Sequence, residues 1–217
     1  MNAEPIQNVL IIDDHPLFRK GLMQLMQTAD EFKIVGEASG GNDGIKLAHA
    51  LKPDMILLDL NMKDMSGIDV LKALKSTDLD ARIIMLTVSD NADDLASAIR
   101  AGADGYLLKD MEPEDLIENI RAGALGKMTL NDKLTGMLAR VLNEGSKPKN
   151  SSEAGLTDQE NKILELISTG KSNKIIAYDL GITEGTVKVH VKHLLKKLNF
   201  KSRVEAALWA MGKSNKI

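Results

Sequence analysis

Short, wholly apolar runs alternate with helix-like stretches through the first half of the chain, and this alternation restricts the fold more than any other feature. The four clearest runs have the length of a strand and are Val9–Ile12, Met55–Leu58, Ile83–Leu86 and Tyr106–Leu108. Strands that are apolar throughout, with helices between them, are typical of a parallel sheet covered on both faces. The sequence therefore predicts an α/β domain with a doubly wound (βα)5 sheet and right-handed crossovers.

The complete pattern contains five strand–helix units. Strands are expected near residues 8–13, 32–38, 54–59, 82–87 and 104–108, and helices near 15–29, 42–51, 67–77, 91–102 and 113–125. A further amphipathic helix is expected at about 131–143. Residues 144–155 have no periodicity and are rich in Gly, Ser, Pro and charge, which is typical of an interdomain linker.

The remainder of the chain has helical signals and no strand-like run. Thr157 and Glu160 form a capping-box pattern at the start of the first helix, which stops near Gly170. A short helix over 173–180 ends at Gly181, Thr183 begins a third helix that runs to about Leu198, and Ser202 begins a fourth. We expect an all-α four-helix domain over 156–217, after a first domain over 1–127 and a linker helix and flexible linker over 128–155.

Charge divides the chain in the same way. Residues 1–150 contain 17 Lys and Arg against 24 Asp and Glu, a net charge of −7, whereas residues 151–217 contain 11 against 7, a net charge of +4. An acidic first part and a basic last part indicate two modules with different partners. The chain has no cysteine, which excludes disulfides and thiolate metal sites. Without a signal-peptide pattern or a long apolar run, we expect a cytoplasmic protein with no membrane partner.

Polar side chains follow the apolar runs of the first domain. They are Asp13 and Asp14, Asp59, Thr87 and Lys109. Ligands bind at the carboxyl ends of the strands in sheets of this kind, so these residues are expected to share one rim. Paired carboxylates suit Mg²⁺, a carboxylate can act as a nucleophile, and an ammonium and a hydroxyl can bind phosphoryl oxygens. Each residue alone could be an ordinary surface group, but five at matching strand ends favour a phosphoryl site with Asp59 as nucleophile.

The third helix of the second domain has one apolar stripe and one basic face. The stripe consists of Val187, Val191, Leu194, Leu195 and Leu198, and the opposite face carries Val189, Lys192, His193 and Lys196, with Lys188 on its flank. Six Lys or Arg residues and no acid lie between Glu184 and Glu205. A helix–turn–helix frame with such a face fits the DNA major groove. The alternative is a solvated basic face. A metal site at His190 and His193 is disfavoured because no cysteine or acid lies near them.

The first domain resembles the response-regulator receiver domains over roughly residues 6–127. The resemblance is carried by Asp13-Asp14-His15-Pro16, by Leu57-Leu58-Asp59-Leu60-Asn61-Met62 with Gly67 beyond it, by Thr87, and by Gly105-Tyr106-Leu107-Leu108-Lys109. It implies that Asp59 is the phosphoacceptor and that Asp14, Asp59 and the backbone carbonyl of Asn61 bind Mg²⁺, with Asp13 acting through water. It also implies that Thr87 and Tyr106 form a switch pair, in which the ring turns inward when the hydroxyl engages phosphate.

The second domain resembles the four-helix domain of LuxR-type regulators over residues 156–211. The resemblance is carried by Leu156-Thr157-x-x-Glu160, Asn173-Lys174-x-Ile176-Ala177, Thr186-Val187-Lys188-x-His190 and Ser202-Arg203-Val204-Glu205-Ala206. It implies that Lys188, Val189 and Lys192 read bases and that the last helix forms a dimer contact. Trp209 on that helix is assigned to core packing in preference to an interface. Together the two domains resemble the NarL/FixJ family, and its nitrate/nitrite regulators in particular.

These observations predict a two-component response regulator that binds DNA. A sensor histidine kinase is expected to phosphorylate Asp59, after which the receiver releases a DNA-binding helix that it covers and the protein forms a homodimer on DNA. We expect no enzyme activity beyond self-phosphorylation from small donors and autodephosphorylation. Two alternatives stay open: a Mg²⁺-dependent phosphatase, which Asn61 disfavours because it is not a general acid, and a DNA-binding protein whose receiver only docks partners.

Overall fold

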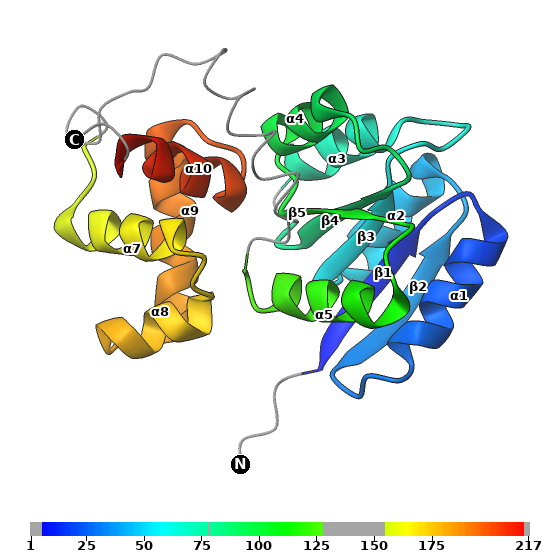
Figure 1. Ribbon diagram of the computed structural model, residues 1–217, viewed down its shortest axis with the longest axis horizontal. Helices are drawn as coiled ribbons and strands as arrows, with labels where there is room; N and C mark the ends of the chain where they lie inside the picture. Colours follow the sequence, from blue (N-terminus) through cyan, green and yellow to red (C-terminus); the bar gives the residue numbers. More distant parts are fainter. Residues whose placement is uncertain (1–5, 78, 128–154, 215–217) are drawn as a thin grey trace.

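Five parallel strands form one sheet in the N-terminal domain (Figure 1). The computed structural model describes residues 6–77, 79–127 and 155–214. The strands are β1 (Gln7–Ile12), β2 (Phe32–Ala38), β3 (Met55–Asp59), β4 (Arg82–Thr87) and β5 (Gly105–Leu108), in the spatial order β2-β1-β3-β4-β5. The central position of β1, β3 and β4 explains why their sequences are apolar on both faces. The predicted parallel sheet is confirmed.

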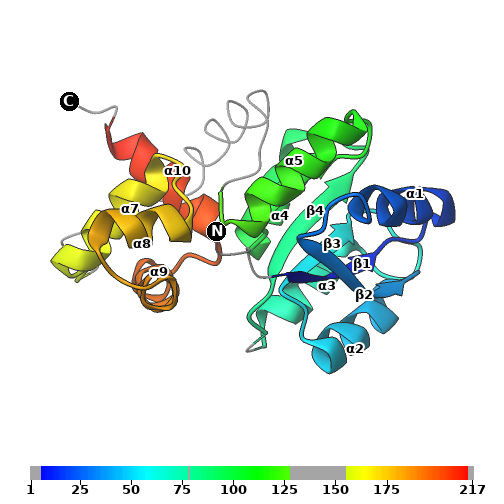
Figure 2. The same cartoon turned by 90° about the horizontal axis from the view of Figure 1, so that it is seen from below.

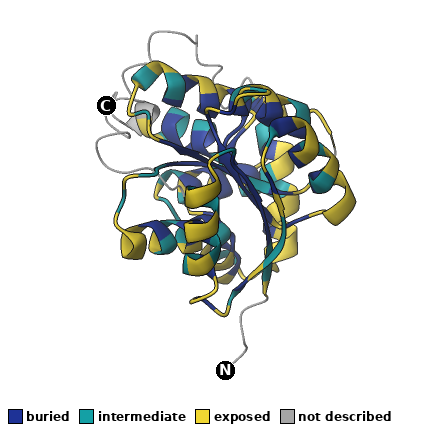
Figure 3. Ribbon diagram, turned by 90° about the vertical axis from the view of Figure 1, so that its right-hand side faces the viewer, coloured by how far each residue is buried: buried dark blue, intermediate teal, exposed yellow. Residues whose placement is uncertain are grey.

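Helices cover both faces of the sheet, so successive strand residues enter two different cores (Figure 3). Val9 and Ile11 pack with α1 (Pro16–Met26) and α5 (Pro113–Ala124). Leu10 and Ile12 pack on the other face, with α2 (Gly41–Leu51), α3 (Gly67–Lys75) and α4 (Ala92–Ala101). All four of these β1 side chains are fully buried. This arrangement leaves the carboxyl ends of the strands as the open edge of the domain.

Helix boundaries follow local hydrogen bonding. The helix expected over 15–29 ends at Met26, because Thr28 donates its hydroxyl proton to the carbonyl of Leu25 at 2.7 Å and the chain turns toward β2. Ser66 caps α3 by accepting from the amide of Asp69 at 3.2 Å. The helix expected at 131–143 lies outside the described residues.

The turn between β3 and α3 requires glycine. A Cβ at Gly67 would lie 2.1 Å from the carbonyl oxygen of Asp59. The amide of Gly67 also donates to the carbonyl of Leu60 at 2.8 Å. This close backbone approach ties the start of α3 to the end of β3, and so fixes the position of Asp59.

Within residues 155–214, four helices make up the C-terminal domain (Figure 2). They are α7 (Asp158–Ser168), α8 (Asn173–Leu180), α9 (Glu184–Leu198) and α10 (Arg203–Ser214). The predicted capping box is present: the amide of Thr157 donates to Glu160 Oε2 at 2.8 Å and the amide of Glu160 donates to Thr157 Oγ1 at 3.3 Å. Gly181 ends α8 in the left-handed region, with φ of 65°. Within the described residues, no helix is both long and apolar enough to cross a membrane.

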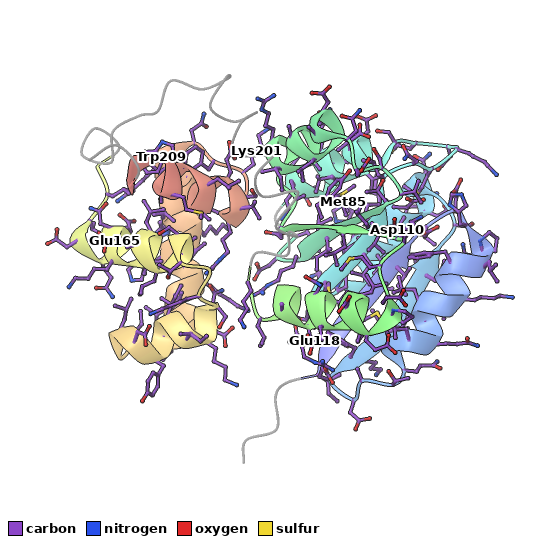
Figure 4. All side chains as sticks on the ribbon, viewed as in Figure 1. Met85, Asp110, Glu118, Glu165, Lys201 and Trp209 are labelled. Carbon is purple, nitrogen blue, oxygen red and sulfur yellow. The ribbon has the colours of Figure 1, made fainter. Side chains whose placement is uncertain are left out.

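Helix α10 contacts both domains. On one side, Ala206 and Ala207 join the core of the C-terminal domain, where Trp209 packs edge-to-face on Phe200 with ring centroids 5.7 Å apart. On the other side, Val204 and Leu208 are buried in the same cluster as the α3 and α4 face of the first domain. Lys201, just before α10, lies on the side of the C-terminal domain that faces α4 (Figure 4). The core-packing assignment of Trp209 agrees with this geometry.

Replacing Gly67 should test the close approach that positions Asp59. The Gly67→Ala variant should lose about 1–3 kcal/mol of unfolding free energy, because the methyl group must displace backbone atoms. Gly21 in α1 is the matched control, since a Cβ there meets no atom within 4 Å. The Gly21→Ala variant should gain up to about 1 kcal/mol through helix propensity. Urea denaturation measures both, and equal stability of the two variants would contradict this account of the turn.

Candidate functional site

Acidic side chains from two neighbouring strands meet at the open edge of the sheet. Asp13 and Asp14 follow β1, and Asp59 is the last residue of β3. Asp13 is fully buried and Asp59 is 2% exposed. One ligand atom from each of these carboxylates and from His15 lie within 4.8 Å of one another. The predicted convergence of the three carboxylates is therefore present.

Lys109 supplies the counter-charge for this cluster. Its ammonium nitrogen lies 2.8 Å from Asp13 Oδ2 and 2.9 Å from Asp59 Oδ1, and it also lies 4.7 Å from the centre of the Phe18 ring. The lysine side chain is only 7% exposed, so these ion pairs are shielded from water. Buried carboxylates are costly unless they are paired, and a single ammonium here serves two of them.

The ionisation of Asp59 reflects opposing influences. Burial raises the pKa of Asp59 above its ordinary value, and the charge of Asp13 adds to the increase. The ammonium of Lys109 and the backbone amide of Asn61, which donates to Asp59 Oδ1 at 3.3 Å, lower that pKa but do not cancel the effect of burial. A divalent cation beside Asp59 would favour the ionised carboxylate that a nucleophile needs.

Two carboxylate oxygens of the cluster are open to a cation. Asp14 Oδ1 and Asp59 Oδ2 are buried and accept no hydrogen bond, whereas Asp14 Oδ2 accepts from the amide of Lys63 at 3.1 Å. Buried polar atoms normally have partners, so orphaned oxygens on adjacent carboxylates indicate a ligand. Mg²⁺ prefers oxygen ligands, and the donor set therefore fits this ion.

Thr87 and Tyr106 lie beside the cluster, and both contact Ser89 in the loop that follows β4. The backbone amide of Lys109 donates to the carbonyl of Thr87 at 2.7 Å, which joins β4 to the lysine. The Thr87 hydroxyl oxygen accepts from the amide of Ser89 at 3.0 Å instead of contacting a carboxylate. The Tyr106 ring is fully buried, and its hydroxyl donates to the carbonyl of Ser89 at 3.1 Å. Burial raises the pKa of Tyr106 to about 12, so the phenol is neutral near pH 7.

The Tyr106 ring lies inward, where the carbonyl of Ser89 offers its hydroxyl an acceptor. That the ring turns inward when Thr87 engages phosphate stays a prediction. Ser89 also donates through its hydroxyl to Asp94 Oδ2 on α4 at 2.7 Å. A continuous set of contacts thus leads from the end of β4 to the start of α4.

Sequence reasoning missed His15 as a member of the cluster. Its position beside Asp13 and Asp14, immediately before a proline that starts α1, was the available signal. The backbone amide of His15 donates to Asp13 Oδ1 at 2.8 Å, which holds the residue against the site. Its imidazole reaches all three carboxylates.

The basic face of α9 is exposed to solvent. Val187, Leu194 and Leu198 are buried against the rest of the domain. The four predicted DNA contacts are exposed: Lys188, Val189, Lys192 and Lys196. Lys197 has a structural role instead, because its ammonium lies 2.7 Å from Glu160 Oε2 at the start of α7. The helix–turn–helix frame and its outer face agree with the sequence prediction.

The expected covering of this face by the receiver is absent for these four residues. The first domain instead buries Val204 and Leu208 of α10. Sequence patterns could not distinguish the two arrangements, because both helices present apolar and basic residues. The contact between the domains therefore involves the helix expected to form dimers, not the exposed face of α9.

Comparison with known proteins agrees with this architecture. Residues 9–121 match the family described as response regulator receiver domain, and residues 154–210 match bacterial regulatory proteins of the luxR family. The chain is 50% identical over 208 residues to the nitrate/nitrite response regulator protein NarL of Escherichia coli K12, covering 96% of each chain. It is 48% identical over 206 residues to NarP of the same strain, covering 95% of this chain and 94% of that protein.

A solved structure extends the comparison to three dimensions. The response regulator ChrA, from a heme-sensing two-component system, is 31% identical with a TM-score of 0.52, over 96% of this chain and 98% of that one. Receiver geometry, a helix–turn–helix domain and sequence identity over nearly the whole length lead to one assignment. The chain belongs to the two-component response regulators that join a receiver domain to a LuxR-type DNA-binding domain.

Proposed function

We propose that this chain is a transcription factor activated when a sensor histidine kinase phosphorylates Asp59. The observation that carries the proposal is the environment of that carboxylate. It is buried at the open edge of the sheet, one oxygen is held by Lys109, and the other accepts no hydrogen bond. A buried carboxylate with one free oxygen and a neighbouring lysine ammonium is suited to accept a phosphoryl group.

Each residue of the cluster has a distinct role in the proposal. In the transfer, an Asp59 oxygen forms a bond to phosphorus while the bond from phosphorus to the kinase histidine breaks. The ammonium of Lys109 and the hydroxyl of Thr87 bind phosphoryl oxygens. Asp13, Asp14, Asp59 and the backbone carbonyl of Asn61 hold Mg²⁺, which when bound offsets the charge of the carboxylates and the incoming group.

The proposed output is binding of DNA by a homodimer. Lys188, Val189, Lys192 and Lys196 form an exposed face on α9, with the helix anchored by its buried stripe. The names of the two Escherichia coli relatives support nitrate/nitrite-responsive genes as targets. We further propose the domain borders 1–127, 128–155 and 156–217, a cytoplasmic location, and no catalysis beyond self-phosphorylation from small donors and autodephosphorylation.

Activation is proposed to free α10 from the receiver. Thr87 contacts Ser89, Ser89 contacts Asp94 at the start of α4, and α4 packs on α10. A phosphoryl group on Asp59 would accept a hydrogen bond from the Thr87 hydroxyl, and movement of that side chain toward Asp59 would disturb this set of contacts. Release of α10 would expose Val204 and Leu208, which the receiver buries. The apolar face so exposed is available for a second copy of the domain.

Phosphorylation of Asp59 is tested by intact mass. After incubation with Mg²⁺ and acetyl phosphate, the parent protein should gain one phosphoryl group and the Asp59→Asn variant none, because the amide is not a nucleophile. Asp64→Asn is a matched control, since this aspartate is exposed in the following loop. Labelling of the Asp59→Asn variant to the parent level would contradict the assignment.

Base reading by α9 is tested by Lys192→Ala. If this lysine makes a good base contact, binding to a specific operator should weaken by about 1–3 kcal/mol, while binding to unrelated DNA changes less. Lys162→Ala on the exposed side of α7 is the control and should leave both affinities near the parent value. Fluorescence anisotropy with both DNAs measures the difference, and unchanged operator affinity of Lys192→Ala would count against the role.

The α10 contact is tested by a reversible crosslink. A Cβ at Gly102 would lie 3.4 Å from the Cβ of Lys201, close to the roughly 3.5–4.5 Å that a disulfide spans. Because the chain has no cysteine, a Gly102→Cys, Lys201→Cys variant would contain only these two thiols.

Oxidation of this variant should weaken operator binding of the phosphorylated protein by about tenfold, a typical coupling between two sites, and reduction should restore it. Each single cysteine variant controls for strain at Gly102, where φ is 109°. Equal binding by the oxidised and reduced double variant would show that α10 need not leave the receiver.

A further inference from the structure

His15 places a ring nitrogen among the carboxylates of the phosphoryl site. Its Nδ1 lies 3.0 Å from Asp14 Oδ1, and 3.5 Å from both Asp13 Oδ1 and Asp59 Oδ2. The residue precedes α1, yet its side chain makes no capping hydrogen bond to that helix. The imidazole is therefore engaged with the cluster and not with its own helix.

The oxygens of Asp13, Asp14 and Asp59 differ in the groups that contact them. Lys109 holds Asp13 Oδ2 and Asp59 Oδ1, and the amide of Lys63 holds Asp14 Oδ2. Two oxygens without a hydrogen bond, Asp14 Oδ1 and Asp59 Oδ2, lie 3.0 and 3.5 Å from the imidazole nitrogen, while Asp13 Oδ1, also 3.5 Å away, accepts from the amide of His15. One nitrogen thus lies close to two buried oxygens that Lys109 does not contact.

The separations match the edges of a metal coordination polyhedron. With metal–ligand bonds of about 2.0–2.1 Å, neighbouring ligands lie about 3.0 Å apart in an octahedron and about 3.4 Å apart in a tetrahedron. The nitrogen–oxygen distances of 3.0 and 3.5 Å fall at these values. One ligand atom from each of the four residues also lies within 4.8 Å of the others, so side-chain adjustments alone could bring the imidazole and the carboxylates around one cation.

We propose that His15 Nδ1 is a metal ligand, and that it gives this site a preference for first-row transition divalent cations over Mg²⁺. Carboxylates alone suit Mg²⁺ and Mn²⁺, whereas imidazole suits Zn²⁺, Ni²⁺, Co²⁺ and Fe²⁺. The inference rests on the metal site of the proposed function and adds one ligand and a selectivity to it. Receiver chemistry in this chain would then respond to which divalent cation is available.

Other imidazoles require control in the experiment. His49, His190 and His193 are the remaining histidines, and the last two lie three residues apart on α9. Metal titrations are therefore made in a His190→Gln, His193→Gln background of the full chain. In that background, His15→Phe keeps a ring but removes the ligating nitrogen. The His15 side chain is 63% exposed, so the fold should tolerate the change, which thermal denaturation checks.

Isothermal titration with Co²⁺ and with Mg²⁺ gives the decisive comparison. His15→Phe should weaken Co²⁺ binding at least about tenfold, since loss of a group that only hydrogen-bonds to a metal ligand already lowers metal affinity by that factor. Mg²⁺ affinity should stay within about twofold. The visible absorption of bound Co²⁺ should also change when the nitrogen ligand is lost.

Asp14→Asn separates failure of this inference from failure of the metal site. This variant should weaken binding of both cations. If Asp14→Asn weakens binding of both cations, two results for His15→Phe would contradict the inference. Either both affinities change by the same factor, or both stay unchanged, and in each case His15 is not a selective ligand. If Asp14→Asn binds both cations like the background protein, the metal site of the proposed function is itself absent.

Discussion

The ammonium of Lys109 is the interaction on which the receiver site depends. It joins β5 to β1 and β3 by contacting Asp13 and Asp59 in a place that water barely reaches. Without it, two buried carboxylates would repel each other with no counter-charge beside them. With it, Asp59 stays at the strand end with one oxygen held and one free. Every proposed step, from cation binding to phosphoryl transfer, uses this arrangement.

The contacts around Ser89 connect that site to the rest of the molecule. Ser89 accepts from the buried Tyr106 hydroxyl and donates to Asp94 on α4. Helix α4 in turn shares a core with Val204 and Leu208 of α10. The same face of the receiver therefore binds the output domain and borders the phosphoryl site. This geometry explains how one added charge at Asp59 could alter the contact between domains.

Much of the fold could be predicted because its signals are local. The apolar runs at β1, β3, β4 and β5 identified buried parallel strands, and Thr157 with Glu160 identified the start of α7. The gathering of Asp13, Asp59 and Lys109 at one edge followed from the parallel arrangement, which brings the carboxyl ends of the strands together. Less predictable were the end of α1, which a hydroxyl–carbonyl contact at Thr28 decides, and the Ser89 carbonyl as the acceptor for the Tyr106 hydroxyl.

The sequence by itself determined the two-domain organisation, most of the secondary structure and the polar groups that follow the strands, since each depends on residues close together in the chain. Only the tertiary structure decided which carboxylate oxygens stay free, that His15 faces them, and that α10 rather than the exposed face of α9 meets the receiver. These features depend on distances between residues far apart in sequence. Periodicity reports which face of a helix is buried, but not which neighbour buries it.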